Sequence, residues 1–211
     1  RDSHEGVRAA AARALGAFGA AEFVDAVALR LDDESTDVRR AALESLANLG
    51  TKGHAPRVRA LLDDAWPYTR CQAARTLRAL GERPDWRPIA GLLDDADRDI
   101  RRLAFATLAA IDAREAAPEI AHRLREVDKE TRVAAARALA ELEAVEHLED
   151  LSWLLEDSNA WVRAEGALRL GELASVLGTA EERAAWARRI EPLESDPEPR
   201  ARRAASIALV R

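Results

Sequence analysis

Side chains that could carry out catalysis are few in this sequence, and they do not cluster. The four histidines are spread along the chain at His4, His54, His122 and His147. His54 and His147 share a position of an internal repeat, but three repeats separate them, or about 30 Å at about 10 Å for each packed helix layer. They cannot bind one metal ion together, and the sequence therefore predicts neither a metal site nor a cofactor.

The single cysteine, Cys71, is the other nucleophile to consider. It falls near the start of a predicted helix, where the helix N-terminus lowers a thiol pKa, but no histidine stands at the matching positions of the neighbouring repeats to act as a base. We interpret Cys71 as a small residue that fills a small space. One cysteine cannot form an internal disulfide, which fits a reducing compartment, and we expect a cytoplasmic protein that is not an enzyme.

Arginine offers a different chemistry, the binding of anions. Only Lys52 and Lys129 are lysines, so nearly all of the 32 cationic side chains carry the planar guanidinium fork that fits carboxylate and phosphate. On the outward positions of successive predicted helices the middle of the chain is cationic, while Glu141, Glu165 and Glu172 make the C-terminal end acidic. The candidate binding residues are Arg40, Arg75, Arg78, Arg102 and Arg137.

The positions of these residues follow from a repeat of 31 residues. Each of the first six copies has a β-branched residue followed by arginine, and an acid five positions before the β-branched residue, whose place is taken by Ala201 in the last copy. A seventh copy begins at Asp196 after eight inserted residues. The arginines are Arg8, Arg39, Arg70, Arg101, Arg132, Arg163 and Arg202, and the acids are Asp2, Asp33, Asp64, Asp95, Glu126, Asp157 and Asp196.

Spacing within one repeat predicts two helices. After the β-branched residue, apolar and small residues form one stripe with the period of a helix, and Gly19, Gly50 or Gly81 ends it. Asp112 and Glu143 replace this glycine in later repeats, where we expect a less regular helix end. A shorter helix precedes each second helix and carries a leucine in every case, at Leu31, Leu62, Leu93, Leu124 and Leu155.

The segment Asp33 to Gly50 best preserves the pattern acid-x4-Val-Arg-x2-Ala-x2-Ala-Leu-x2-Leu-Gly, which resembles the short HEAT-like repeat first described in phycobilisome lyases. The resemblance implies an all-α, right-handed solenoid of about six to seven stacked antiparallel helix pairs over residues 1–211. It also implies that the second helices line a concave groove. Deoxyhypusine hydroxylase and the HEAT-like alkylpurine DNA glycosylases have similar scaffolds, but the iron-binding His-Glu pairs of the former are limited here to His4-Glu5, and no Trp or Tyr lies on the second-helix faces as in the latter.

The repeated acid and arginine have a structural and a functional interpretation. A ligand site should be local, whereas a contact between neighbouring repeats should recur in every repeat, as this pair does. We therefore expect each acid to accept hydrogen bonds from an arginine of its own or an adjacent repeat and to favour the positive end of the second helix.

The last repeat departs from the pattern at about residues 173–196. Leu170, Leu173 and Leu177 continue the helical stripe, Gly178 is the predicted C-cap, and Thr179 with Glu182 forms a capping box for the next helix. This insertion is either a functional addition or a transition toward another domain. The chain opens on the acid before a second helix and closes within a second helix, so we expect a fragment of a longer protein.

The composition limits the functional classes. A net charge of −6 argues against a general nucleic-acid binder, and the sequence contains neither a transmembrane helix nor a signal peptide. We predict a protein-protein interaction scaffold or regulatory module that binds an acidic or phosphorylated peptide in the groove. The alternatives are binding of nucleic acid or another polyanion through the same arginines, and a lyase activity of the kind the resemblance suggests.

Overall fold

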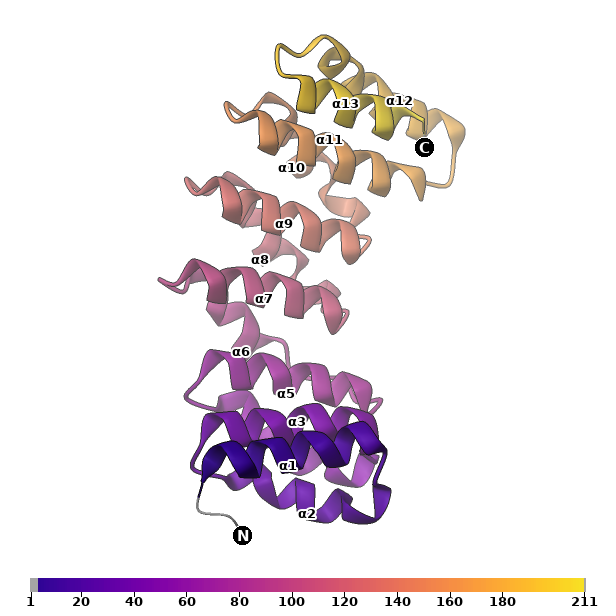
Figure 1. The fold of residues 1–211 in the computed structure, drawn as a ribbon. Helices are drawn as coiled ribbons and strands as arrows, with labels where there is room; N and C mark the ends of the chain where they lie inside the picture. The colour runs from indigo at the N-terminus through magenta and orange to yellow at the C-terminus, as the bar shows by residue number, and fades with distance from the viewer. Residues whose placement is uncertain (1–3, 211) are drawn as a thin grey trace. The chain divides into compact units, whose positions relative to one another are not determined.

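Residues 4–210 are described by a computed structural model, in which helices joined by short turns make up the chain (Figure 1). No strand occurs in this range, and none of its helices is long and apolar enough to cross a membrane. The chain forms two compact units, unit 1 (Arg1–Ile111) and unit 2 (Asp112–Arg211). In each unit first and second helices alternate, and the first helix is the shorter one in every pair except α12 (Ala180–Ile190) and α13 (Pro199–Leu209), so the fold is the all-α solenoid that the repeat predicts.

Unit 1 contains four second helices, of which α1 packs on α3 and α3 on α5. Each first helix is a short α-helix that tightens into a 3-10 turn before the acid of the next turn. The second helices are α1 (Glu5–Phe18), α3 (Thr36–Leu49), α5 (Pro67–Ala79) and α7 (Arg98–Ala110). The first helices are α2 (Val24–Ala28) with η2 (Leu29–Asp32), α4 (Ala55–Ala60) with η4 (Leu61–Asp63), and α6 (Arg87–Ala90) with η5 (Gly91–Asp94); η1 (Ala21–Phe23) and η3 (Lys52–His54) precede α2 and α4.

Unit 2 repeats this arrangement, with α9 packed on α11 and α11 on α13. Its second helices are α9 (Lys129–Glu141), α11 (Ala160–Ser175) and α13 (Pro199–Leu209). Its first helices are α8 (Ala117–His122) with η7 (Arg123–Arg125), α10 (Leu148–Ser152) with η9 (Trp153–Glu156), and α12 (Ala180–Ile190) with η10 (Glu191–Ser195); η6 (Arg114–Ala116) and η8 (Val145–His147) precede α8 and α10.

The core consists of the predicted apolar stripes. The first-helix leucines are buried in all five repeats, from Leu31 to Leu155. One second-helix position is always small, and the first helix of the same repeat explains why, because a Cβ on Gly166 would lie 2.7 Å from Cβ of Leu154. The residues at this position are Ala11, Ala42, Ala73, Ala104, Ala135 and Gly166.

The C-terminal ends of two second helices, at Asp112 and Glu143, are more regular than the sequence predicts. Asp112 and Glu143 adopt the left-handed backbone, with φ of 56° and 54°, as Gly19 and Gly81 do at 67° and 77°. The amide N–H groups of Glu143 and Ala144 bond the carbonyls of Ala140 and Leu139, which closes α9 as regularly as a glycine would. The prediction of a less regular end was therefore wrong, and Gly50, with an extended backbone, is the exception among the glycines.

The insertion is partly as predicted. Thr179 and Glu182 form the capping box that begins α12, and Ile190 and Leu193 are buried. The C-cap prediction was wrong, because α11 ends at Ser175 with Val176 as its cap rather than at Gly178. Gly171 on α11 lets the helix approach α13, where its Cβ would lie 2.8 Å from Cβ of Ala208.

Candidate functional site

The turn acids and the arginines of the repeat join neighbouring repeats, which confirms the structural interpretation. Arg39 donates from Nε and Nη2 to both carboxylate oxygens of Asp64, at 2.8 and 3.1 Å, and from Nη1 to the backbone carbonyls of Asp33 and Glu34. We call the arginine at this position of each repeat, of which Arg39 is one, a ladder arginine. The same link to the next turn acid is made by Arg8 with Asp33, Arg132 with Asp157 and Arg163 with Asp196, whereas Asp2 lies outside the described residues.

Five turn aspartates also hold the start of the second helix that follows them: Asp33, Asp64, Asp95, Asp157 and Asp196. Asp33 accepts the backbone N–H of Ser35, and Asp196 accepts that of Glu198. Hydrogen bonds from Arg8 and Arg163, which outweigh the opposing effect of burial, lower the pKa of Asp33 and of Asp196 respectively. These carboxylates are thus committed to the structure and unavailable to a ligand.

One link between successive described turns is missing in unit 1. Arg70 donates to the carbonyls of Asp64 and Ala65 within its own turn, but in the described part of unit 1 it forms no ion pair with Asp95. The carboxylate of Asp95 accepts the backbone N–H of Asp97 there, and its backbone carbonyl accepts from Arg101. The step from α5 to α7 therefore lacks the carboxylate contact that joins α1 to α3 and α3 to α5.

The second helices of unit 1 carry four of the five candidate arginines, and we call Arg40, Arg75, Arg78 and Arg102 the second-helix face. Arg40 is engaged: its guanidinium lies 4.0 Å from the Glu44 carboxylate and 3.7 Å from Asp37, and 5.9 Å from the ring centre of Tyr68. Arg102 is exposed and lies 3.6 Å from Asp99 of its own helix. Arg78 is exposed near the end of α5. Arg40 and Arg102 therefore keep weak local partners.

Arg75 differs from the other candidates. It is half-buried, its Nε is fully buried, and within residues 4–210 its guanidinium has neither a hydrogen bond nor a carboxylate within 4.0 Å. Leaving a partly desolvated cation unpaired costs free energy, because burial removes water without supplying another acceptor. Arg75 is the residue of this face with the most to gain from an anion.

Arg137 lies in unit 2 and has a partner already. Its Nε and Nη2 donate to the two carboxylate oxygens of Glu165 at 2.7 and 3.0 Å, and Arg169 binds the same carboxylate at 2.9 Å. Glu165, which the sequence placed on an exposed acidic surface, is buried on α11. Burial raises the pKa of Glu165, but Arg137 and Arg169 together outweigh it and hold this pKa below its ordinary value.

The lowered pKa of Glu165 predicts an acid-sensitive contribution to stability. The ionised carboxylate stabilises unit 2 above its ordinary pKa of 4.5, and this stability is lost as the pH falls through the lower pKa of the folded protein. We expect Glu165→Gln to lower the urea midpoint at pH 7 and to make its decline between pH 7 and pH 3 shallower. Glu191→Gln, at an exposed carboxylate, should leave that decline unchanged; equal slopes for both variants would contradict this assignment.

The catalytic candidates remain dispersed in the structure. Cys71 is buried on α5, and burial raises the pKa of its thiol. His54 and His147 lie beside single carboxylates, those of Asp25 and Asp150. Among residues 4–210 no three His, Cys, Asp or Glu side chains converge as metal ligands would.

Two surface features escaped the sequence interpretation. Trp153 in unit 2 is 47% exposed, and the guanidinium of Arg125 lies 3.3 Å from its ring centre, so the half-covered ring forms part of a cation–π pair. Trp186 pairs similarly with Arg189, which also binds Glu149 through two hydrogen bonds. Spacing alone gives no signal for these pairs, because their members come from different repeats or from the insertion.

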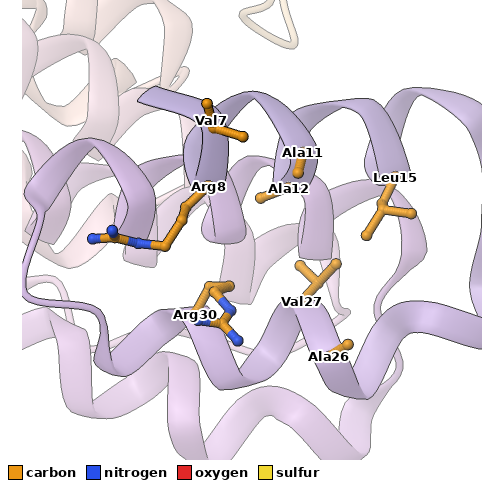
Figure 2. A pocket seen from close by; sticks show the side chains of 8 residues that line it. All are labelled: Val7, Arg8, Ala11, Ala12, Leu15, Ala26, Val27 and Arg30. Atoms are coloured by element: carbon orange, nitrogen blue, oxygen red, sulfur yellow. The ribbon is translucent and has the colours of Figure 1, made fainter. Parts of the chain in front are cut away.

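A cavity of about 240 Å³ opens between α1 and α2 in unit 1 (Figure 2). Its lining is mostly apolar, with Val7, Leu15 and Val27 facing it and Arg8 and Arg30 at one side. Val7 is 50% exposed, whereas Val38 at the same repeat position is fully buried under its own first helix.

This architecture, helix pairs joined by repeated turn contacts, defines an α-helical repeat solenoid. Residues 24–109 and 87–171 match the family model for HEAT repeats. The chain therefore belongs to the HEAT repeat family. No curated protein sequence matches it significantly.

Several solved structures are similar in fold at low sequence identity. The complex of CpcE and CpcF of phycocyanin lyase from Nostoc sp. PCC7120 matches with a TM-score of 0.54 and 22% identity, over 100% of this chain and 90% of that chain. A designed armadillo repeat protein in complex with the peptide (KR)4 matches with a TM-score of 0.57 and 19% identity, over 87% and 97% of the two chains. Human deoxyhypusine hydroxylase matches with a TM-score of 0.50 and 21% identity, over 99% and 80%.

Proposed function

We propose that this protein is a non-catalytic scaffold or regulatory module, cytoplasmic, whose second-helix face in unit 1 binds an acidic or phosphorylated segment of a partner protein. Repeat solenoids commonly present extended surfaces to peptide segments. The observation that carries the proposal is the half-buried guanidinium of Arg75, which has no carboxylate partner among the described residues. A carboxylate or phosphate supplies the acceptor that this planar fork lacks.

The charge of the face indicates the sign of the ligand. Arg75, Arg78 and Arg102 stand on neighbouring helices, and Glu44, which has the repeat position of Arg75 on α3, already contacts Arg13 at 3.4 Å. The similar designed armadillo protein binds a peptide of alternating Lys and Arg, which this cationic face would repel. We therefore expect the opposite preference, for an acidic segment.

A binding titration tests the proposal. Fluorescence anisotropy with labelled acidic, phosphorylated and basic peptides of matched length, at physiological salt, should show binding of the first two only. Arg75→Glu combined with Arg78→Glu should abolish binding without lowering the thermal midpoint by more than a few degrees. Arg13→Ala is the matched control, because Arg13 occupies the repeat position of Arg75 but is paired with Glu44. Binding of no peptide, or unchanged binding by the double variant, would refute the proposal.

The alternative is a nucleic acid or another polyanion bound through the same arginines, favoured only by their clustering on α5 and α7. Such binding would ignore sequence and weaken steeply with salt. A salt titration of the same variants with single-stranded DNA distinguishes the two. A lyase role rests on likeness of fold to phycocyanin lyase alone.

A further inference from the structure

The repeat shows which partner Arg75 lacks. Arg13, Arg75 and Arg137 occupy the same repeat position, two repeats apart from one another. Arg13 on α1 pairs with Glu44 on α3, and Arg137 on α9 pairs with Glu165 on α11, so each binds a carboxylate on the following second helix. These carboxylates stand 31 and 28 residues after their arginines.

The following helix of Arg75, α7, offers no such carboxylate. The residues 31 and 28 positions after Arg75 are Ala106 and Leu103, and Ala106 is exposed. The arginine is thus present, and apolar side chains stand on the next helix where Arg13 and Arg137 have a carboxylate. A carboxylate from another molecule can fill the same place.

Two kinds of contact that join other neighbouring second helices are missing between α5 and α7. One is a hydrogen bond from a side-chain hydroxyl to the preceding second helix, and the other is the link from a ladder arginine to the next turn acid. The hydroxyls of Ser45 and Thr76 donate to the carbonyls of Ala12 and Leu43 on the preceding second helix, at 2.7 and 3.0 Å. The equivalent hydroxyl of Thr107 is fully buried and does not bond the carbonyl of Ala74, which the repeat places opposite it; it lies beside the thiol of Cys71 instead. Together with the missing link from Arg70 to Asp95, this shows that α7 lacks two of the polar contacts that join other neighbouring second helices.

Charge gives a reason for these missing contacts. An arginine–carboxylate pair joins α1 to α3, and another joins α9 to α11. By contrast, α5 carries Arg75 and Arg78, and α7 carries Arg102. Like charges on adjacent helices repel, and nothing between them in the described chain neutralises Arg75. An anion at this step would remove the repulsion and favour a closer packing.

We propose that the carboxylate of the bound segment takes the place of the missing glutamate beside Ala106, pairs with Arg75, and draws α7 onto α5. In the closed step the Thr107 hydroxyl reaches the carbonyl of Ala74, and Arg70 reaches Asp95. This deepens the proposed function, on which it rests, by naming the position of one recognised acid and the movement that its binding produces. A ligand shifts such an equilibrium only through better contacts in the closed state, and the Arg75 pair supplies them.

The test builds the glutamate into the chain. Ala106→Glu should pair with Arg75 and so compete with the ligand, weakening binding of the acidic peptide at least tenfold while raising the thermal midpoint. Ala106→Gln, of the same size but uncharged, should bind like the parent. Ala106→Glu combined with Arg75→Ala should lose the gain in thermal midpoint, which ties the effect to that pair.

Cys71 reports on the step itself. It is the only cysteine, is buried on α5, and faces Thr107 of α7, so its rate of reaction with a disulfide reagent measures opening between the two helices. Saturating acidic peptide and Ala106→Glu should each slow this reaction severalfold, and Ala106→Gln should not.

The outcomes separate the two proposals. If the parent binds acidic peptide through Arg75 but Ala106→Glu binds it equally well, the site of the carboxylate is wrong and the proposed function stands. If no peptide binds the parent, the proposed function fails. In that case slower labelling and a higher midpoint in Ala106→Glu would still support the missing glutamate and the closing step, and unchanged values would overturn them.

Discussion

Ala104→Leu is expected to destabilise unit 1 by about 1–3 kcal/mol, because the added carbons must enter a fully packed seam. Ala104 is fully buried on α7. At the same repeat position, Gly166 leaves no room for a Cβ against Leu154 of the first helix, and Leu92 is the corresponding residue before Ala104. Urea unfolding followed by circular dichroism would show the lower midpoint.

Ala11→Leu is the matched control for this substitution. Ala11 has the same repeat position on α1, but it is exposed and lines the cavity between α1 and α2. The cavity accepts the additional carbons, so we expect a change within about 0.5 kcal/mol, the range of ordinary surface substitutions. A large loss at Ala11, or none at Ala104, would show that helix propensity rather than packing governs this position.

Arg39→Ala should destabilise the protein by about 1–3 kcal/mol more than Arg70→Ala, since only the first substitution breaks a carboxylate pair. Both are ladder arginines at the same place in their helices, and both donate to carbonyls of their own turn. Arg39 alone adds the two hydrogen bonds to Asp64, whose side chain is almost fully buried. The difference in the free energy of unfolding therefore isolates the contact between repeats.

The comparison also has a clear contrary result. Equal losses for Arg39→Ala and Arg70→Ala would mean that the carbonyl contacts within the turn carry the stabilisation and that the carboxylate adds nothing. Asp64→Asn provides a second readout, because it should reproduce most of the Arg39→Ala effect while leaving Arg39 and its own turn in place.

The sequence predicted the parts of this fold that depend on periodicity. A repeat of 31 residues fixes which helix positions are buried, so Leu31 and its equivalents were identified without a structure. The link from each arginine to a turn acid was predicted for the same reason. Asp112 and Glu143 were misjudged because helix closure depends on backbone geometry, and a residue other than glycine can adopt a positive φ where the surrounding packing requires it.

The candidate site was less accessible to such reasoning. Spacing places Arg40, Arg75, Arg102 and Arg137 on second helices but does not say which of them has a partner. Pairing depends on how far a side chain reaches. Arg137 binds Glu165, which stands three residues away from the position one repeat later, whereas Arg75 lies opposite an alanine and a leucine. The cation–π pair of Arg125 and Trp153 likewise joins residues 28 positions apart, which is not the repeat period.

The ladder arginines also bear on how unfolding spreads along the chain. In a linear array of repeats, cooperativity arises from the free energy of coupling between neighbours, and an array with one weak coupling unfolds in separate blocks. Each arginine that binds both its own turn and the next turn acid contributes to that coupling. Arg70 binds only its own turn, so the coupling between the repeats of α5 and α7 is weaker. Local unfolding that begins on one side of this junction is therefore expected to stop there.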